Sequence, residues 1–271
     1  DPERENWKVL LPERHQMVLE SVYLAGGKLI AKYLRDASNV LEIYSKDGTR
    51  EGEIDMPGLG TVNSISSKDK YDEVFYSFTS FQVPSEIYKY DVSEKTNEQY
   101  YRPELNFDPD KYVTSQIFYT SKDGTKVPMF IVHKKGLEMD GNRPTLLYGY
   151  GGFNISKTPE FSLRNLIWLE NNGVFALPNI RGGGEYGEKW HKAGTLLRKQ
   201  NVFDDFIAAA EYLIDNNNTS SERLAIYGGS NGGLLVGAVT NQRPDLFAVA
   251  LPAVGVMDML RFHKFTIGHY W

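Results

Sequence analysis

The stretch Arg223–Gly233 reads RLAIYGGSNGG and determines how the second half of the chain is expected to fold. Its first five residues predict a strand, and the residues from Asn231 to Thr240 predict a helix. A Gly-x-Ser-x-Gly pattern between a strand and a helix is typical of a nucleophile elbow, a tight turn with strained dihedral angles. Glycine neighbours permit such a turn, so Ser230 is expected to project from the end of a sheet. The start of the following helix helps to stabilise developing negative charge.

Two interpretations of this turn compete, because a glycine-rich strand-to-helix turn can also bind phosphate. No Lys followed by Ser or Thr comes after these glycines, which disfavours a P-loop. Acyl transfer also needs an oxyanion hole, and one donor is the backbone N–H after the nucleophile, here that of Asn231. The segment Leu146–Phe153, LLYGYGGF, is a strand running into glycines, as expected of the loop with the second donor. Its alternative, a dinucleotide-binding turn, lacks the full glycine spacing.

From Tyr112 onward, expected strands and helices alternate, which indicates a mostly parallel α/β sheet with flanking helices. The strands are expected at Tyr112–Thr120, Lys126–His133, Thr145–Tyr150, Val174–Pro178, Arg223–Tyr227 and Phe247–Ala253. The helices are expected from Thr158-Pro159 to Glu170, at Asp204–Asp215 and at Asn231–Thr240. A third glycine cluster, Arg181–Gly187, is interpreted as a structural loop that braces the elbow.

Before about residue 105 the apolar pattern has a period of two, with short runs broken by turn residues. Glu42-Ile43-Tyr44 recurs as Glu86-Ile87-Tyr88, an offset of 44 residues. A period of about 40–50 residues with several strands per unit is typical of propeller blades. The alternative is a plain antiparallel sheet in which the three-residue match is chance.

Four motifs together resemble the prolyl oligopeptidase family of serine peptidases. They are YGYGGF at Tyr148–Phe153, RGGGEYG at Arg181–Gly187, GGSNGG at Gly228–Gly233 and NQRPDLF at Asn241–Phe247. The resemblance implies a partial α/β hydrolase preceded by the last blades of a β-propeller. Residues 1–105 would form about two blades, and residues 106–271 the N-terminal portion of the peptidase domain.

The resemblance also implies roles for individual residues. Ser230 would be the nucleophile, and the Tyr150 hydroxyl and the Asn231 amide would form the oxyanion hole. The pocket for the proline before the scissile bond would be lined by Phe153, Val256 and Trp271. An apolar, aromatic slot suits proline, which has a flat ring and no N–H. The alternative for Trp271 is an aromatic ring that packs elsewhere. No cofactor or metal is needed.

The triad of an α/β hydrolase follows the order Ser, then Asp or Glu, then His. Only 41 residues follow Ser230, and the candidates among them, Asp258, His263 and His269, are expected to be structural. The chain is therefore expected to be a C-terminally truncated fragment that lacks the triad Asp and His. A serine without its base is a weak nucleophile, so the fragment alone is expected to be inactive.

Composition excludes several other functions. The net charge is −5, with 30 basic and 35 acidic residues and no basic cluster, which disfavours nucleic acid and anionic membranes as partners. No apolar run approaches the roughly 18 residues that a membrane span needs. The absence of cysteine excludes disulfides and cysteine-based metal chemistry, and it fits a cytoplasmic protein. The complete protein is expected to be a monomer.

The resulting hypothesis is a serine endopeptidase that hydrolyses short proline-containing peptides after proline, through an acyl-enzyme at Ser230. Three alternatives remain: an oligopeptidase that cuts after Lys or Arg, an esterase or lipase, and a non-catalytic interaction protein.

Overall fold

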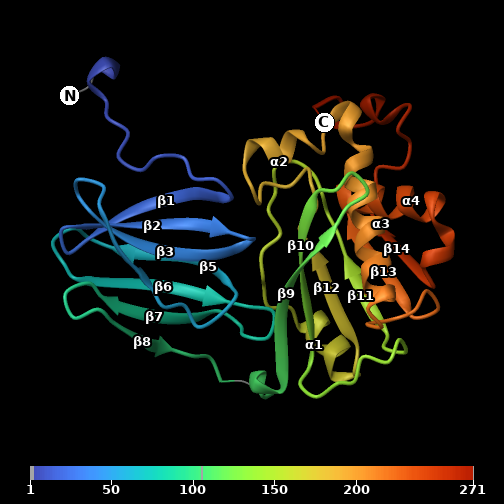
Figure 1. The fold of residues 1–271 in the computed structure, drawn as a ribbon, viewed down its shortest axis with the longest axis horizontal. Coiled ribbons are helices and arrows are strands. Elements are labelled where there is room, and N and C mark those ends of the chain that lie inside the picture. The colour runs from blue at the N-terminus through green and yellow to red at the C-terminus, as the bar shows by residue number, and fades with distance from the viewer. Residues whose placement is uncertain (1–2, 105, 271) are drawn as a thin grey trace. The chain divides into compact units, whose positions relative to one another are not determined.

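A computed structural model describes residues 3–104 and 106–270 of the chain. The chain divides into two compact units (Figure 1). The first comprises Asp1–Phe107 and Thr158–Phe161, and the second comprises Asp108–Lys157 and Ser162–Trp271. Within the described residues, no helix is long and apolar enough to cross a membrane.

The first unit contains two four-stranded antiparallel sheets in which neighbouring strands follow one another along the chain. The first sheet has β1 Met17–Ala25, β2 Lys28–Arg35, β3 Ser38–Ser45 and β4 Arg50–Ile54, and the second has β5 Thr61–Ser67, β6 Glu73–Thr79, β7 Glu86–Asp91 and β8 Thr96–Tyr101. Apolar side chains of both sheets pack into one buried cluster, which includes Ile30, Leu41, Val74 and Phe78. Each sheet has the form expected of a propeller blade.

The repeated Glu-Ile-Tyr sequence has a physical cause, because its glutamates are buried in equivalent places on β3 and β7. Glu42 is 1% and Glu86 2% exposed. The tyrosine two residues later donates a hydrogen bond to each carboxylate, over 2.5 Å for Glu42 and 2.7 Å for Glu86. An arginine completes each site, Arg50 at 3.1 Å and Arg102 at 2.9 Å. Buried carboxylates need such partners, so the match is a repeated structural site rather than chance.

The second unit is built on a six-stranded sheet with the order β14-β13-β11-β12-β10-β9. Its strands are β9 Tyr112–Thr120, β10 Lys126–Lys134, β11 Thr145–Tyr148, β12 Val174–Pro178, β13 Leu224–Gly229 and β14 Val249–Ala253. Strands β12, β11, β13 and β14 pair in parallel, while β10 pairs antiparallel with both β9 and β12. Among the described strands only β10 therefore runs against the rest, and the sheet is mostly parallel.

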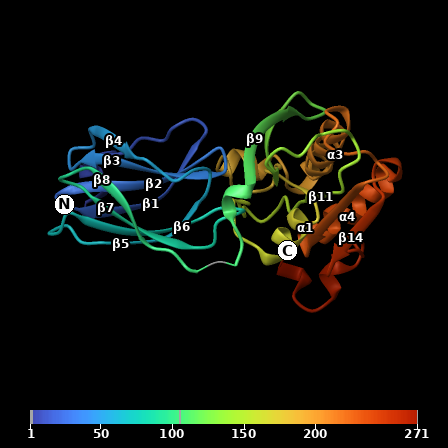
Figure 2. The same ribbon diagram turned by 90° about the horizontal axis from the view of Figure 1, so that it is seen from below.

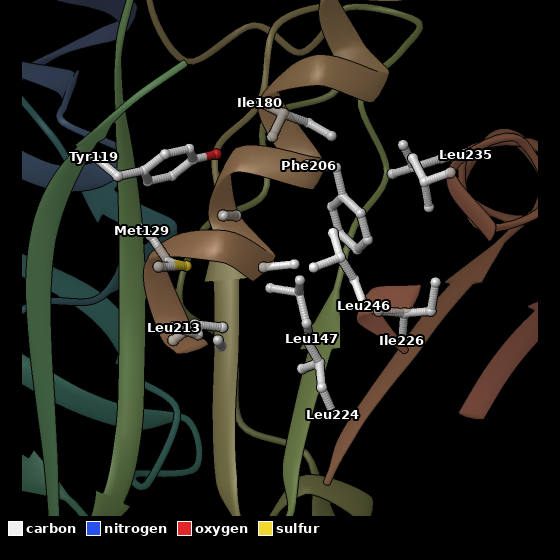
Figure 3. Close-up of a cluster of buried hydrophobic side chains, with 14 of the residues drawn as sticks. Tyr119, Met129, Leu147, Ile180, Phe206, Leu213, Leu224, Ile226, Leu235 and Leu246 are labelled. Atoms are coloured by element: carbon white, nitrogen blue, oxygen red, sulfur yellow. The ribbon is translucent and has the colours of Figure 1, made fainter. Parts of the chain in front are cut away.

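The α-helices of this unit are α1 Leu163–Glu170, α2 Glu188–Lys192, α3 Gln200–Asp215 and α4 Asn231–Gln242. Helix α4 packs along β13 and β14 (Figures 1 and 2). The core lies between the sheet and the helices (Figure 3), where Leu147 and Ile226 of the sheet meet Phe206 and Leu213 of α3 and Leu235 of α4. All five side chains are fully buried.

Several predicted boundaries are wrong. The first helix begins at Leu163 rather than Pro159, because residues 158–161 belong to the first unit. There the Pro159 carbonyl accepts a hydrogen bond from Thr61 Oγ1 at 2.6 Å, and the Phe161 ring stacks on Phe107 at 5.6 Å. Helix α3 begins at Gln200, four residues earlier than predicted. Helix α2 of the second unit was not predicted.

Candidate active site

Ser230 occupies the turn between β13 and α4 in the conformation that a nucleophile elbow requires. Its φ is 56° and its ψ is −115°, a region that non-glycine residues rarely adopt. Its backbone N–H donates to the Ala253 carbonyl at 2.9 Å, and its carbonyl accepts from Leu234 N at 3.1 Å. These bonds hold the strained residue, and its side chain is exposed at the N-terminus of α4.

The glycines around Ser230 are not equivalent. A Cβ on Gly228 would lie 2.4 Å from the Gly232 carbonyl oxygen, and one on Gly232 would lie 2.5 Å from the Gly149 carbonyl oxygen. At Gly229 the nearest atom, the Ala253 carbonyl oxygen, is 3.9 Å away. The outer glycines of the motif are therefore required by close backbone contact, whereas space is open at the residue directly before the serine.

Tyr150 lies two residues beyond β11, in the loop predicted to carry the second oxyanion donor. Its side chain is half-buried, and burial, with a smaller effect of Tyr148, raises the pKa of the phenol above its usual value. The hydroxyl therefore stays protonated at neutral pH and can donate a hydrogen bond. The Lys157 ammonium lies 4.6 Å from the centre of the Tyr150 ring.

Residues 149–152, which follow β11 and include Tyr150, are called the tyrosine loop. The side chain of Asn231, which is 7% exposed, joins this loop to the elbow. Its Nδ2 donates to the Tyr150 carbonyl at 2.6 Å. Its Oδ1 accepts from Lys199 Nζ at 3.1 Å, and the same ammonium donates to the Gly151 carbonyl at 2.9 Å. Lys199 was not predicted as a site residue, because a single lysine before a helix carries no motif in the sequence.

The glycine cluster at Arg181–Gly187 packs against the tyrosine loop. A Cβ on Gly182 would lie 2.7 Å from the Gly151 carbonyl oxygen, and Asn154 N donates to the Gly182 carbonyl at 3.1 Å. The cluster is thus a structural loop, and in these contacts it braces the tyrosine loop rather than the elbow itself.

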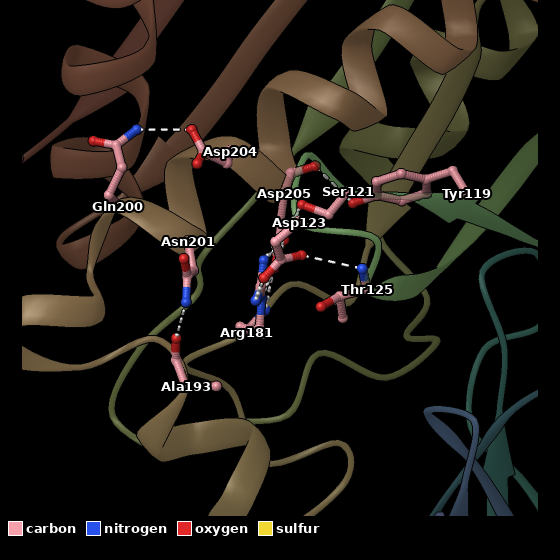
Figure 4. A network of polar contacts seen from close by, with 10 residues as sticks. All are labelled: Tyr119, Ser121, Asp123, Thr125, Arg181, Ala193, Gln200, Asn201, Asp204 and Asp205. Carbon is pink, nitrogen blue, oxygen red and sulfur yellow. Dashed lines mark hydrogen bonds and ion pairs between the residues drawn. The ribbon is translucent and has the colours of Figure 1, made fainter.

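Arg181 anchors this glycine loop through a buried polar network (Figure 4). Its guanidinium makes a two-pronged contact with Asp205 of α3, with Nη2 at 2.6 Å from Oδ1 and Nε at 2.9 Å from Oδ2. Ser121 Oγ also donates to Asp205. Asp123, in the β9–β10 hairpin, accepts from Arg181 Nη1, and this bond lowers the pKa of Asp123 to about 2.

The residues predicted to line a proline pocket come from different segments of the chain. Phe153 is 51% exposed and has a φ of 56°, directly after the tyrosine loop. Val256 is half-buried in the loop after β14. That loop lies against the elbow, since a Cβ on Gly233 would lie 2.6 Å from Gly255 Cα. Trp271 lies outside the described residues.

The three residues after the elbow that were considered for the triad contact residues close to them in sequence. Asp258 pairs with Arg261 at 2.6 Å, and His263 and His269 are exposed, with ring contacts to the adjacent residues Phe262 and Tyr270. The Ser230 side chain makes no capping hydrogen bond to the backbone of α4. Residues 3–104 and 106–270 contain no group of three or more His, Asp or Glu side chains that could hold a metal ion.

Comparison with known proteins identifies this arrangement. A model of the prolyl oligopeptidase family matches residues 159–271, and a model of the prolyl oligopeptidase N-terminal beta-propeller domain matches residues 1–103. The chain belongs to the prolyl oligopeptidase family. The predicted fold is thereby confirmed, a partial α/β hydrolase preceded by blades of a β-propeller.

The family contains curated relatives that align with the whole chain. A prolyl endopeptidase of Elizabethkingia meningoseptica is 50% identical over 271 residues, which is 100% of this chain and 38% of the relative. A prolyl endopeptidase of Dictyostelium discoideum is 47% identical over 270 residues, or 98% of this chain and 35% of the relative. The chain thus spans well under half the length of these relatives.

Solved family structures have the same fold. One comes from a structural and mechanistic study of two prolyl endopeptidases, with a TM-score of 0.91, 48% identity and coverage of 100% of this chain and 40% of that one. Another is prolyl oligopeptidase B from Galerina marginata bound to a 25-residue macrocyclization substrate, with a TM-score of 0.90, 39% identity and coverage of 97% and 37%. The relatives named here are all called prolyl endopeptidases or prolyl oligopeptidases.

The two glycines before Ser230, Gly228 and Gly229, offer a matched pair of variants. In the full-length protein, Gly228→Ala is expected to destabilise the fold by at least about 1–3 kcal/mol, because its Cβ meets a backbone oxygen that cannot move freely. Gly229→Ala is expected to stay within about 0.5 kcal/mol of the parent, since its Cβ meets open space. Thermal unfolding of the variants measures the difference, and equal shifts would contradict the assigned packing.

Glu185 of the glycine loop is expected to make stability depend on pH. The side chain is 1% exposed, Lys157 N donates to its Oε1 at 2.9 Å, and its Oε2 has no partner among the described residues. Burial raises the pKa of Glu185 from 4.5 to about 7. The unfolded chain loses this proton first, so the free energy of unfolding falls as pH rises from about 4.5 to 7.

Glu185→Gln is expected to remove this pH dependence, which amounts to at most about 3 kcal/mol. The neutral amide mimics the protonated acid, so the variant should gain stability relative to the parent as pH rises from 5 to 8. Urea unfolding at both pH values measures the change, with the exposed Glu222→Gln as control. Parallel pH profiles of Glu185→Gln and the parent would show that Glu185 is ionised in the folded protein.

Proposed function

We propose that the full-length protein containing this chain is a serine endopeptidase that hydrolyses short peptides on the carboxyl side of proline. The observation that carries the proposal is Ser230 itself, an exposed side chain on a strained backbone at the start of the 12-residue helix α4. A serine held in this way at a helix N-terminus suits attack on a carbonyl carbon. Membership of the prolyl oligopeptidase family and 50% identity to a prolyl endopeptidase support the choice of reaction.

In the proposed reaction, Ser230 Oγ attacks the carbonyl carbon of the proline residue. The Tyr150 hydroxyl and the Asn231 backbone N–H donate hydrogen bonds to the oxyanion that forms. Collapse of the tetrahedral intermediate breaks the C–N bond and leaves an acyl-enzyme on Ser230, which water then hydrolyses. The serine proton passes to a histidine oriented by an aspartate and then to the leaving amine. We infer that parts of the protein outside these 271 residues supply both.

The proline pocket is proposed to include Phe153, Val256 and Trp271. Phe153 and Val256 each directly follow a residue that contacts the elbow, since Gly152 lies against the Asn231 side chain and Gly255 against Gly233. Aromatic and aliphatic walls suit a pyrrolidine ring, which offers no N–H to satisfy. Short peptides are the proposed substrates, and the Galerina relative solved with a 25-residue peptide supports this choice.

The test uses the purified full-length protein with three reporters. Two are peptides of equal length, one cleaved after Pro and one after Arg, and the third is a short-chain ester of similar size. We expect kcat/KM for the Pro reporter to exceed that for Arg by at least about a hundredfold, since none of the three residues proposed for the pocket carries a carboxylate to pair with a guanidinium. Preferred cleavage after Arg, or of the ester alone, would replace the proposal with the corresponding alternative. No reaction with any reporter or with a fluorophosphonate would indicate a non-catalytic protein.

Three further features belong to the same proposal. We propose that residues 1–105 are about two propeller blades and residues 106–271 the N-terminal portion of the peptidase domain. The division into compact units near residue 107 and the family-model match over residues 1–103 support this boundary. A cytoplasmic location agrees with the absence of cysteine. Cell fractionation tests the location, and light scattering tests the proposed monomeric state of the full-length protein.

A further inference from the structure

Lys199 lies beside the proposed oxyanion hole and contacts both segments that build it. The residue directly precedes α3, and its ammonium reaches the Gly151 carbonyl at 2.9 Å and Asn231 Oδ1 at 3.1 Å. Gly151 is the residue after Tyr150, and Asn231 is the residue after Ser230. One side chain from a third segment thus bridges the loop that carries one proposed donor and the turn that carries the other.

The bridge continues through Asn231. While its Oδ1 accepts from Lys199, its Nδ2 donates to the Tyr150 carbonyl at 2.6 Å. Tight packing limits other positions of this amide, because a Cβ on Gly152 would lie 2.5 Å from Asn231 Nδ2. The three hydrogen bonds form a chain from the Gly151 carbonyl through Lys199 and Asn231 back to the Tyr150 carbonyl. This arrangement fixes the relative position of the tyrosine loop and the elbow.

Lys199 is half-buried, and its partners differ from those of the buried cation Arg181 in the same unit. Arg181 pairs with the Asp205 carboxylate at 2.6 Å, whereas both acceptors of Lys199 are neutral amide oxygens. Burial lowers the pKa of Lys199 to about 8. An ammonium that leaves water without a counter-ion costs free energy that an apolar side chain of similar length would not. Stability alone therefore does not account for a lysine at this position.

We propose that Lys199 is a positioning residue for the oxyanion hole, one that holds the Tyr150 loop and the Asn231 turn together by bridging Gly151 and Asn231. The proposal rests on the proposed peptidase function. Preorganised donors act on the transition state more than on the bound substrate. Loss of the bridge should therefore lower kcat and the affinity for transition-state analogues, while substrate binding changes little.

The experiment compares Lys199→Met with the parent in the full-length protein, at equal active-site concentrations set by fluorophosphonate titration. We expect kcat for a Pro reporter to fall about 10- to 100-fold, somewhat less than the loss of a complete oxyanion donor. The inhibition constant of a peptide aldehyde that ends in proline should rise by the same factor. KM and the inhibition constant of the product peptide should change by less than about threefold, because they report ground-state binding.

Two further variants separate positioning from general damage. Lys199→Arg keeps a cation and several donors, so it should recover part of the lost kcat. Lys189→Met, an exposed lysine in α2, serves as the matched control and should behave like the parent. If Lys199→Met does not fold, Lys199→Gln replaces it in the same comparison. The glutamine side chain is uncharged but can still donate hydrogen bonds to the acceptors of Lys199.

The outcomes distinguish this inference from the function on which it rests. An active parent combined with an unchanged kcat in Lys199→Met contradicts the role of Lys199 alone. Equal losses in kcat, KM, aldehyde affinity and product affinity also contradict it, because they indicate general disruption of the site. A parent that does not cleave Pro reporters removes the proposed function and this inference together.

Discussion

Ser230→Ala is expected to lower kcat of the full-length protein towards a Pro reporter by about six orders of magnitude, the loss seen when the nucleophile of a serine protease is removed. Removal of Oγ prevents formation of the acyl-enzyme, so the remaining rate comes only from binding and from the oxyanion donors. The backbone at residue 230 has a φ of 56° in the parent, and alanine has the same steric preferences as serine there. The fold should therefore be retained.

The measurement is kcat with a fluorogenic Pro reporter, together with fluorophosphonate labelling and thermal unfolding. Ser66→Ala, an exposed serine of β5, is a suitable control and should retain activity and labelling. Retention of more than about one per cent of the parent activity by Ser230→Ala would require another nucleophile, since loss of the nucleophile in a serine protease costs about six orders of magnitude in kcat.

The second large effect concerns stability, at the ion pair between Arg181 and Asp205. Asp205→Asn is expected to lower the free energy of unfolding of the full-length protein by about 3–5 kcal/mol, because it removes the buried counter-ion of the Arg181 guanidinium and leaves only the partly exposed Asp123 carboxylate. Asp205 is 0% and Arg181 4% exposed, so water cannot replace the lost carboxylate. The Arg181 backbone N–H also loses an acceptor at 3.0 Å. Denaturant unfolding measures the change.

An exposed pair in the same unit provides the control. Arg243 and Asp245 contact each other at 2.7 Å, but their side chains are 36% and 60% exposed. Asp245→Asn should therefore cost no more than about 1 kcal/mol. Equal losses at both sites would mean that the Arg181 network is hydrated and does not anchor the glycine loop. The consequence for function is indirect, since Gly182 of that loop packs against Gly151.

The sequence predicts the elbow well because the constraint there is local. A strained turn between a strand and a helix needs glycine where backbones meet, and Gly228 and Gly232 do meet carbonyl oxygens. The propeller repeat was visible for a similar reason, since Glu42 and Glu86 each need a tyrosine two residues later. Patterns that arise from contacts within a few residues can be recognised from the sequence alone.

Features that depend on distant contacts could not be predicted in this way. Pro159 looked like the first residue of a helix, but a hydrogen bond from Thr61, 98 residues away in sequence, holds it in the first unit. Lys199 belongs to no sequence motif, and its hydrogen bonds to Gly151 and Asn231 form only in the folded protein. The raised pKa of Glu185 likewise follows from complete burial. Trp271 lies outside the described residues, so its role stays a prediction.

The central claim is that Ser230 faces two hydrogen-bond donors, the Tyr150 hydroxyl and the Asn231 backbone N–H. A crystal structure of the full-length protein with a peptide aldehyde ending in proline tests it most directly. We expect a hemiacetal on Ser230 Oγ whose oxygen lies within about 3 Å of both donors. A hemiacetal oxygen that points away from Tyr150 and Asn231, or an adduct on any other residue, would contradict the account.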